Sequence, residues 1–215
     1  MRRLPVYLLI DTSGSMRGEA IEAVKVGLQT MVNTLRQDPF ALESVHLSII
    51  TFDREVKNVL PLTELETLRL PDIETPESGP THLGLALEML CTIVDKEVLR
   101  STSERKGDWM PLLFVMTDGR PSDSMKYRQM IPEVQKRNFG SIIACGAGPD
   151  AKDEYLKELT PTVVHLDTTD SSAFMQFFKW VSASVSSGNR SMGMGMGASA
   201  DVSLPPPPAE VHLVL

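Results

Sequence analysis

Continuous runs of apolar residues alternate along the chain with segments in which apolar positions recur every three or four residues. The runs at 4–10 and 111–116 are rich in strand-forming residues. Such runs are typical of strands that helices cover on both faces of a sheet. The runs at 45–52 and 55–60 are separated by only two residues, which permits an antiparallel hairpin and excludes a crossover connection. Shorter strands are expected at 141–145 and 163–166.

Helical spacing marks the segments between these strands. Ile21, Val24, Leu28 and Met31 begin the first such series, and Asp38-Pro39 ends it. Strands that alternate with helices predict an α/β fold. We expect a Rossmann-like, doubly wound, mostly parallel sheet of six strands, with one antiparallel edge strand and helices on both faces. Helices are predicted at 21–35, from Thr81 to 94, and at 123–137, 151–159 and 174–185, the last with Asp170 as its N-cap.

The composition changes abruptly at Ser186. Residues 187–203 are mainly Gly, Ser, Ala and Met without a periodic apolar face, which predicts a flexible linker. Residues 1–187 are therefore expected to form one domain, and 188–215 a linker, a stiff run of four prolines and an apolar end.

The apolar end suits a strand added to the edge of a sheet. We expect it to dock on its own domain or on a neighbour through Glu210, Val211, Leu213 and Leu215. In this interpretation Glu210 presents its carboxylate to a metal site. A disordered terminus is the alternative.

Charge and cysteine content narrow the classes of partner. The 215 residues carry a net charge of -7, which argues against a nucleic acid or an anionic membrane held by bulk charge. Cys91 and Cys145 are far apart and lack a Cys-x-x-Cys pattern, so we expect two buried thiols and neither a disulfide framework nor a zinc site. No run approaches the length that spans a bilayer. The apolar run after Arg2 and Arg3 superficially resembles a secretion signal but is too short and has no cleavage site, so a cytoplasmic protein is expected.

Oxygen-bearing side chains gather at the ends of two predicted strands. Asp11, Ser13 and Ser15 follow the first strand, Thr81 opens the middle helix, and Asp118 ends the strand at 111–116. In a doubly wound sheet of order 3-2-1-4-5-6, the order reverses between strands 1 and 4, which leaves a crevice at their carboxyl ends. The topology therefore brings these residues together, although each one alone also fits an ordinary turn or helix cap.

Two carboxylates and three hydroxyls are hard donors that suit Mg²⁺ or Mn²⁺, whereas Ca²⁺ usually takes more carboxylates. Helix N-termini expected at Ser15 and Thr81 favour an incoming anion. These features predict metal-dependent capture of a partner's Asp or Glu. Arg17, His82 and Arg120 flank the crevice as a candidate rim for the partner, although a solvated surface role is equally compatible with the sequence.

The Asp-x-Ser-x-Ser motif, Thr81 and Asp118, in this order and context, resemble the metal-ion-dependent adhesion site of a von Willebrand factor type A domain. The resemblance covers about residues 4–187. It implies that Ser13 and Ser15 coordinate the ion through their hydroxyls, that Asp11 and Asp118 act directly or through water, and that Thr81 joins or leaves with conformational state. Gly79-Pro80 departs from the usual pair of glycines and argues against a large movement of that loop.

The acidic chain, the Gly/Ser/Met segment and the proline run with its apolar end are similar to the TerY group of tellurite-resistance proteins. This resemblance implies a bacterial stress-response assembly with a kinase-like or phosphatase-like partner.

An enzyme is the less favoured interpretation. A metal-dependent phosphatase or phosphotransferase of the haloacid-dehalogenase type would also use Asp11, but it needs a second carboxylate two residues later, where this chain has Ser13. Phosphate-binding and nucleophile-elbow motifs are absent from the sequence. We therefore expect a binding module without catalytic residues.

Overall fold

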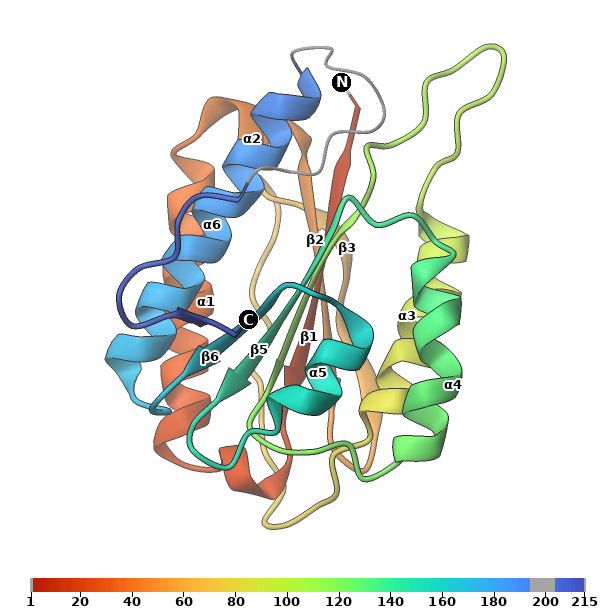
Figure 1. The fold of residues 1–215 in the computed structure, drawn as a ribbon. Helices are drawn as coiled ribbons and strands as arrows, with labels where there is room; N and C mark the ends of the chain where they lie inside the picture. The colour runs from red at the N-terminus through yellow and green to blue at the C-terminus, as the bar shows by residue number, and fades with distance from the viewer. Residues whose placement is uncertain (1, 194–203, 215) are drawn as a thin grey trace.

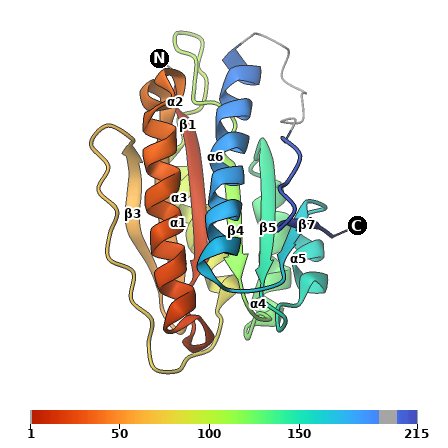
Figure 2. The same ribbon diagram turned by 90° about the vertical axis from the view of Figure 1, so that its left-hand side faces the viewer.

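A seven-stranded sheet forms the centre of the molecule. The computed structural model describes residues 2–193 and 204–214. Strand order is β3-β2-β1-β4-β5-β6-β7, with β3 and β7 antiparallel to their neighbours at the two edges and the other strands parallel. Figure 2 shows these two edges on either side of the sheet. The strands are β1 (Leu4–Asp11), β2 (Val45–Phe52), β3 (Val56–Glu64), β4 (Leu112–Thr117), β5 (Ser141–Ala147), β6 (Val163–Leu166) and β7 (His212–Leu213).

Helices cover both faces of this sheet (Figure 1). The residues of α1, α2 and α6 pack in one buried cluster, and those of α3, α4 and α5 pack in a second cluster on the other face. Among the described residues, the structure contains no helix with the length and apolarity that a membrane span requires. The helices are the 3₁₀ turn η1 (Gly14–Met16), α1 (Glu19–Arg36), α2 (Pro39–Ser44), α3 (Leu83–Glu97), α4 (Ser124–Gln135), α5 (Asp153–Leu159) and α6 (Ser171–Gly193).

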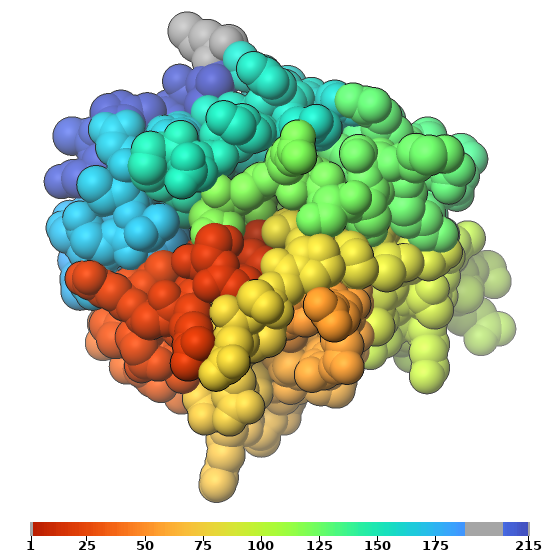
Figure 3. Space-filling model, turned by 90° about the horizontal axis from the view of Figure 1, so that it is seen from below, coloured from red at the N-terminus to blue at the C-terminus, as the bar shows by residue number. Residues whose placement is uncertain are grey.

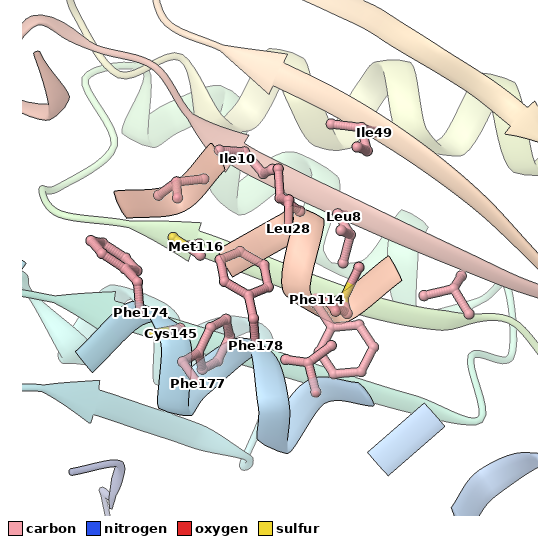
Figure 4. Close-up of a cluster of buried hydrophobic side chains, with 14 of the residues drawn as sticks. Leu8, Ile10, Leu28, Ile49, Phe114, Met116, Cys145, Phe174, Phe177 and Phe178 are labelled. Carbon is pink, nitrogen blue, oxygen red and sulfur yellow. The ribbon is translucent and has the colours of Figure 1, made fainter. Parts of the chain in front are cut away.

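The alternation of side chains along β1 explains its continuous apolar run. Leu8 and Ile10 join the cluster under α1 and α6, whereas Tyr7 and Leu9 join the cluster under α3 and α4. Because both faces are covered, every residue of β1 is buried. Figure 4 shows the first cluster, in which aromatic rings of α6 lie against side chains of β1, β4 and α1.

The predicted six-strand order and the antiparallel hairpin at its edge are confirmed. The structure adds β7, which makes a second antiparallel edge, and α2, which begins at Pro39 because the Asp38 side chain accepts from the backbone nitrogen of Phe40. Asp170 caps α6 as expected, with its Oδ1 2.9 Å from the nitrogen of Ala173. Both cysteines are free and buried.

The last helix is longer than the sequence predicts. It continues to Gly193, so residues 187–193 of the predicted linker are helical. Serine and methionine are compatible with a helix, and the two preceding turns already pack on the core through Val181 and Val185. The remaining residues of the predicted linker, 194–203, lie outside the described residues.

The apolar end docks on its own domain as a strand at the edge of the sheet, one of the two predicted arrangements. The choice of inward-facing residues was partly wrong. Val211 is buried, but Leu213 is 50% exposed and Val214 packs inward instead. The chain turns at 208–211 and then pairs with β6 over only two residues, so the predicted alternation does not hold. Glu210 is exposed, and Leu215 lies outside the described residues.

Close packing between α1 and α6 gives a prediction about stability. A Cβ atom added at Gly27 would lie 2.2 Å from Cδ2 of Phe178. We expect Gly27→Ala to lower the free energy of unfolding by about 1–3 kcal/mol, although alanine is the better helix former. Urea denaturation measures this change. Val26→Ala on the exposed side should stay within about 0.5 kcal/mol of the wild type. If Phe178→Leu does not restore part of the loss in the double variant, the packing explanation is wrong.

Candidate metal centre

Two neighbouring strands carry the carboxylates of the predicted site to one edge of the sheet. Asp11 is the last residue of β1, and Asp118 follows β4 directly. These strands pair in parallel, with Ile10 opposite Met116, so both carboxylates lie at the carboxyl end of the sheet. Figure 3 looks onto this end, where the chain near residues 10–20, 75–82 and 118–122 meets at the surface.

The Asp11 side chain is fully buried and is held by two hydrogen bonds. Its Oδ1 accepts from the backbone nitrogen of Ser13 at 2.8 Å, and its Oδ2 accepts from the hydroxyl of Thr117 at 2.5 Å. Burial raises the pKa of Asp11 to about 6, and the neighbouring charge of Asp118 adds to the rise, whereas the bonds from Thr117 and Ser13 oppose it. The ionised carboxylate is therefore present at neutral pH at a cost in free energy.

A chain of hydroxyl groups connects the loop after β1 to the second carboxylate. The hydroxyl oxygens of Ser13 and Ser15 are 3.1 Å apart, and Ser15 donates to Oδ1 of Asp118 at 2.9 Å. Burial raises the pKa of Asp118 above its ordinary value, with the Ser15 bond acting against the rise. The structure thus brings Asp11, Ser13, Ser15 and Asp118 into one connected cluster, as the sequence predicts.

The loop after β1 does not lead straight into a long helix. Residues Gly14–Met16 form only the turn η1, and α1 begins at Glu19 after Gly18. Gly18 has a φ of 88°, a conformation that favours glycine and interrupts the helix there. The expectation of a helix N-terminus at Ser15 was therefore wrong.

Thr81 lies beside the turn that follows Asp118. Its backbone nitrogen donates to Oγ of Ser122 at 3.0 Å, and its carbonyl accepts from the nitrogen of Ser122 at 2.8 Å. A Cβ atom at Gly119 would be 3.9 Å from the Thr81 hydroxyl, so this hydroxyl faces the same turn. The threonine is therefore next to the cluster, although no hydrogen bond from its side chain to the cluster is described.

The cap of α3 differs from the prediction. His82 occupies the N-cap position of α3 rather than Thr81, and its side chain makes no cap bond. Instead, the carboxylate of Asp123 accepts from the backbone nitrogens of Gly84 at 3.0 Å and Leu85 at 2.9 Å. A capping carboxylate from a distant segment leaves the Thr81 hydroxyl available for another role.

The loop before Thr81 rests on the loop after β1. A Cβ atom at Gly14 would lie 2.7 Å from Cα of Ser78, closer than side chains tolerate against backbone. Glycine at position 14 is therefore required by the approach of a second loop, which fixes Thr81 relative to Ser13 and Ser15.

The three rim residues differ in how freely they face solvent. Arg17 is exposed, with its nearest guanidinium nitrogen 3.9 Å from a carboxylate oxygen of Glu77. The Nδ1 atom of His82 is 3.1 Å from the carbonyl oxygen of Arg54, so this ring is already engaged. Arg120 is exposed beside Gly119. A role in partner binding stays a prediction for all three.

Two supporting residues were missed by the sequence analysis. Thr117 orients Asp11, and its only signal was a hydroxyl at the end of an apolar strand. Asp53, in the link between β2 and β3, accepts from the hydroxyl of Thr12 at 2.8 Å, while its carbonyl accepts from the nitrogen of His82 at 3.1 Å. Nothing in the local sequence distinguishes Asp53 from an ordinary turn aspartate.

The donors of this cluster fit a hard divalent cation. Within 2–193 and 204–214, no ion pair involves Asp11 or Asp118, so two buried carboxylates lie close together without a basic partner. Three or more His, Cys, Asp or Glu side chains do not gather in a metal-binding arrangement anywhere in the described residues. A site of two carboxylates and several hydroxyls is poor for zinc or copper chemistry and suits Mg²⁺ or Mn²⁺.

Comparison with known proteins agrees with this arrangement. The family model described as "von Willebrand factor type A domain" matches residues 6–180. Matrilin-1 of Bos taurus is 30% identical over 131 residues, which cover 58% of this chain and 23% of that protein. Matrilin-3 of Gallus gallus is 27% identical over 129 residues, which cover 58% of this chain and 28% of that protein. The chain thus spans about a quarter of the length of these relatives.

Solved structures share the fold at low sequence identity. Proximal thread matrix protein 1 from the mussel byssus, in a structure with zinc in its metal-ion-dependent adhesion site, superposes with a TM-score of 0.62 at 16% identity, covering 85% of this chain and 48% of that chain. The manganese-loaded TRAP protein of Plasmodium vivax superposes with a TM-score of 0.53 at 18% identity, covering 82% of this chain and 73% of that chain. With the family model matching most of its length, this chain belongs to the von Willebrand factor type A domain family.

Proposed function

We propose that the chain is a metal-dependent protein-binding module that captures a partner's carboxylate through a divalent cation. The cation would be held by Asp11, Ser13, Ser15, Thr81 and Asp118. The observation that carries the proposal is a pair of buried carboxylates, Asp11 and Asp118, that are linked through Ser13 and Ser15 and make no ion pair in the described chain.

Charge balance explains why such a site would bind an acidic group. Hydroxyl ligands are neutral, so the cation is balanced by two carboxylates at most. Ser15 is exposed while Asp11 and Ser13 are buried, so the cluster opens to solvent on one side. A bound cation would supply a Lewis-acidic position on that side, and an Asp or Glu of a partner is the hard anionic ligand that suits it.

The same geometry argues against hydrolysis. Both oxygens of Asp11 already accept hydrogen bonds, and Asp118, as a proposed metal ligand, would be a poor general base for activating water. Position 13, where a haloacid-dehalogenase-like enzyme needs its acid, is a serine bonded to Ser15. We therefore favour binding over the phosphatase or phosphotransferase alternative.

The wider setting rests on the resemblance to the TerY group. We place the protein in the cytoplasm, in a bacterial tellurite-resistance or stress-response assembly, with a kinase-like or phosphatase-like partner that presents the carboxylate. Mg²⁺ is the proposed cation, because the donors are oxygen atoms alone. Support comes from the net charge of -7 and from the proline run and apolar end that follow the domain.

Metal binding can be measured directly. Isothermal titration calorimetry with Mg²⁺ or Mn²⁺ should show one site in the wild type, and Asp11→Ala and Ser13→Ala should abolish or strongly weaken binding, because each removes a proposed ligand. Ser103→Ala, in the exposed loop at the other end of the domain, serves as the control and should bind like the wild type. Equal binding by all four proteins would refute the assignment of the site.

The raised pKa of Asp11 predicts how the stability of the metal-free protein depends on pH. The folded protein holds the Asp11 proton up to about pH 6, whereas the unfolded chain releases it near pH 4, so stability falls as pH rises between these values. The loss is as much as about 3 kcal/mol. In EDTA, Asp11→Asn should reduce this dependence, leaving the part that Asp118 contributes, and should be more stable than the wild type above pH 6.

Denaturation in EDTA at pH 4, 5, 6 and 7 measures this effect. Glu133→Gln is the control, because the hydrogen bond from Lys136 lowers the pKa of Glu133, so removing this carboxylate should not flatten the fall in stability. An unchanged slope in Asp11→Asn would mean that burial does not destabilise the ionised carboxylate.

Partner capture should depend on both the metal and an acidic residue of the partner. A pull-down from bacterial lysate with the wild type should retain the partner in Mg²⁺ and lose it in EDTA, and Asp11→Ala should lose it in both. Once a partner is identified, its Asp or Glu changed to Asn or Gln should weaken binding at least about tenfold, as expected for a charged ligand. Retention that is indifferent to EDTA and to Asp11→Ala would contradict the proposal.

A further inference from the structure

The end of the chain lies against α6 and the outer edge of the sheet. We call residues 204–214 the strap, and the outer edge of β6 together with Trp180 of α6 the edge site. Figure 1 shows the strap passing along α6 before it reaches β6. No residue of the candidate metal centre belongs to the edge site.

Backbone groups hold the strap at two places. The indole nitrogen of Trp180 donates to the carbonyl oxygen of Pro205 at 2.9 Å. Further along, β7 pairs with β6 in the register Val164 to Leu213, and the backbone nitrogen of Val214 donates to the carbonyl of Val163 at 2.9 Å. The strap therefore satisfies an indole and a strand edge that would otherwise face solvent.

Apolar side chains of the strap pack against the buried clusters on both faces of the sheet. Val211 is only 2% exposed and belongs to the cluster under α1 and α6, and Leu204 packs against the same cluster. Val214 packs against the cluster on the opposite face. Nε2 of His212 lies 3.2 Å from a carboxylate oxygen of Asp167 at the exposed surface, a contact that contributes little by itself.

The strap makes few contacts with the domain, so it can be released while the domain stays folded. The paired strand has two residues, and the edge that it covers belongs to a sheet whose other strands are held by longer ladders. Release of a short terminal segment with one buried anchor costs much less than global unfolding. The chain thus contains a strand-receiving surface and a detachable segment that fits it.

From this arrangement we infer that the edge site also receives the strap of a second copy of this chain, so that two copies exchange their C-terminal segments. The structure shows the strap bound to the edge site, and the strap of a second copy has the same residues and can make the same contacts. Residues 194–203 connect α6 to the strap, with a contour of at most about 40 Å. The strap of the same chain and the strap of a second copy therefore compete for one site with the same contacts. The strap of the same chain has the advantage of its tether, which gives it an effective concentration in the millimolar range.

A synthetic peptide of residues 204–215 tests whether the edge site accepts the segment in trans. The full-length Val211→Asp variant should release its own strap, because a carboxylate cannot be buried at this position without cost. Fluorescence anisotropy should then show labelled peptide binding at least about tenfold more tightly to this variant than to the wild type, whose site is occupied. Leu213→Asp is the matched control, since Leu213 is half exposed, and should behave as the wild type.

Two further measurements distinguish release of the strap from a folding defect in the Val211→Asp variant. Circular dichroism should show the same secondary structure in both aspartate variants, and the milder full-length variant Val211→Ser should also bind the peptide more tightly than the wild type. A peptide that itself carries Val211→Asp should not bind. If neither Val211 variant gains affinity for the peptide, the edge site is not a receptor for this segment.

Oligomeric state tests the second copy as occupant. Wild-type protein refolded at about millimolar concentration should contain a dimer by analytical ultracentrifugation, as should Leu213→Asp, whereas Val211→Asp should remain monomeric. EDTA should not change these outcomes, which separates them from failure of the metal centre. Peptide binding without a dimer at any concentration would mean that the edge site serves a different protein's strand, and would overturn the exchange.

Discussion

The carboxylate of Asp11 lies buried at the end of a strand that is covered on both sides, and the rest of the site is arranged around it. Burial makes its ionised form costly, and the Thr117 hydroxyl and the Ser13 backbone nitrogen offset only part of that cost. A second carboxylate, Asp118, lies nearby, and no ion pair to Asp11 is formed in the described chain. Such an arrangement is poor for the stability of the metal-free protein but provides the negative charge that a cation would need.

Strand order and the location of the site were predictable from the sequence because they depend on residue patterns with strong physical consequences. Continuous apolar runs place β1 and β4 in the interior, and the link between β2 and β3 is too short for a crossover. Because β1 and β4 are parallel neighbours, Asp11 and Asp118 lie at one edge of the sheet. The predicted cluster of Asp11, Ser13, Ser15 and Asp118 follows from this topology rather than from the motif alone.

The remaining features depend on contacts between residues distant in sequence. Asp123, the residue before α4, caps α3, and Asp53, in the link between β2 and β3, holds Thr12, so no local sequence pattern predicts either role. The strand β7 is too short for alternation to define its inward face, and its inward residues depend on what α6 and β6 present. Helix α6 continues past the predicted boundary because polar, small residues permit a helix without requiring one.

The close contact between Gly14 and Ser78 means that the packing of two loops limits the size of the residue at position 14. The φ angle at position 14 is not of the left-handed kind, so a larger amino acid there would be acceptable to its own backbone. What excludes it is the main chain of the opposite loop, 2.7 Å from where its Cβ would be. In any relative with a side chain at this position, the loop that corresponds to Ser78 must lie further from the loop after β1. The threonine that corresponds to Thr81 would move with that loop. Substitutions in the two loops should therefore covary across the family.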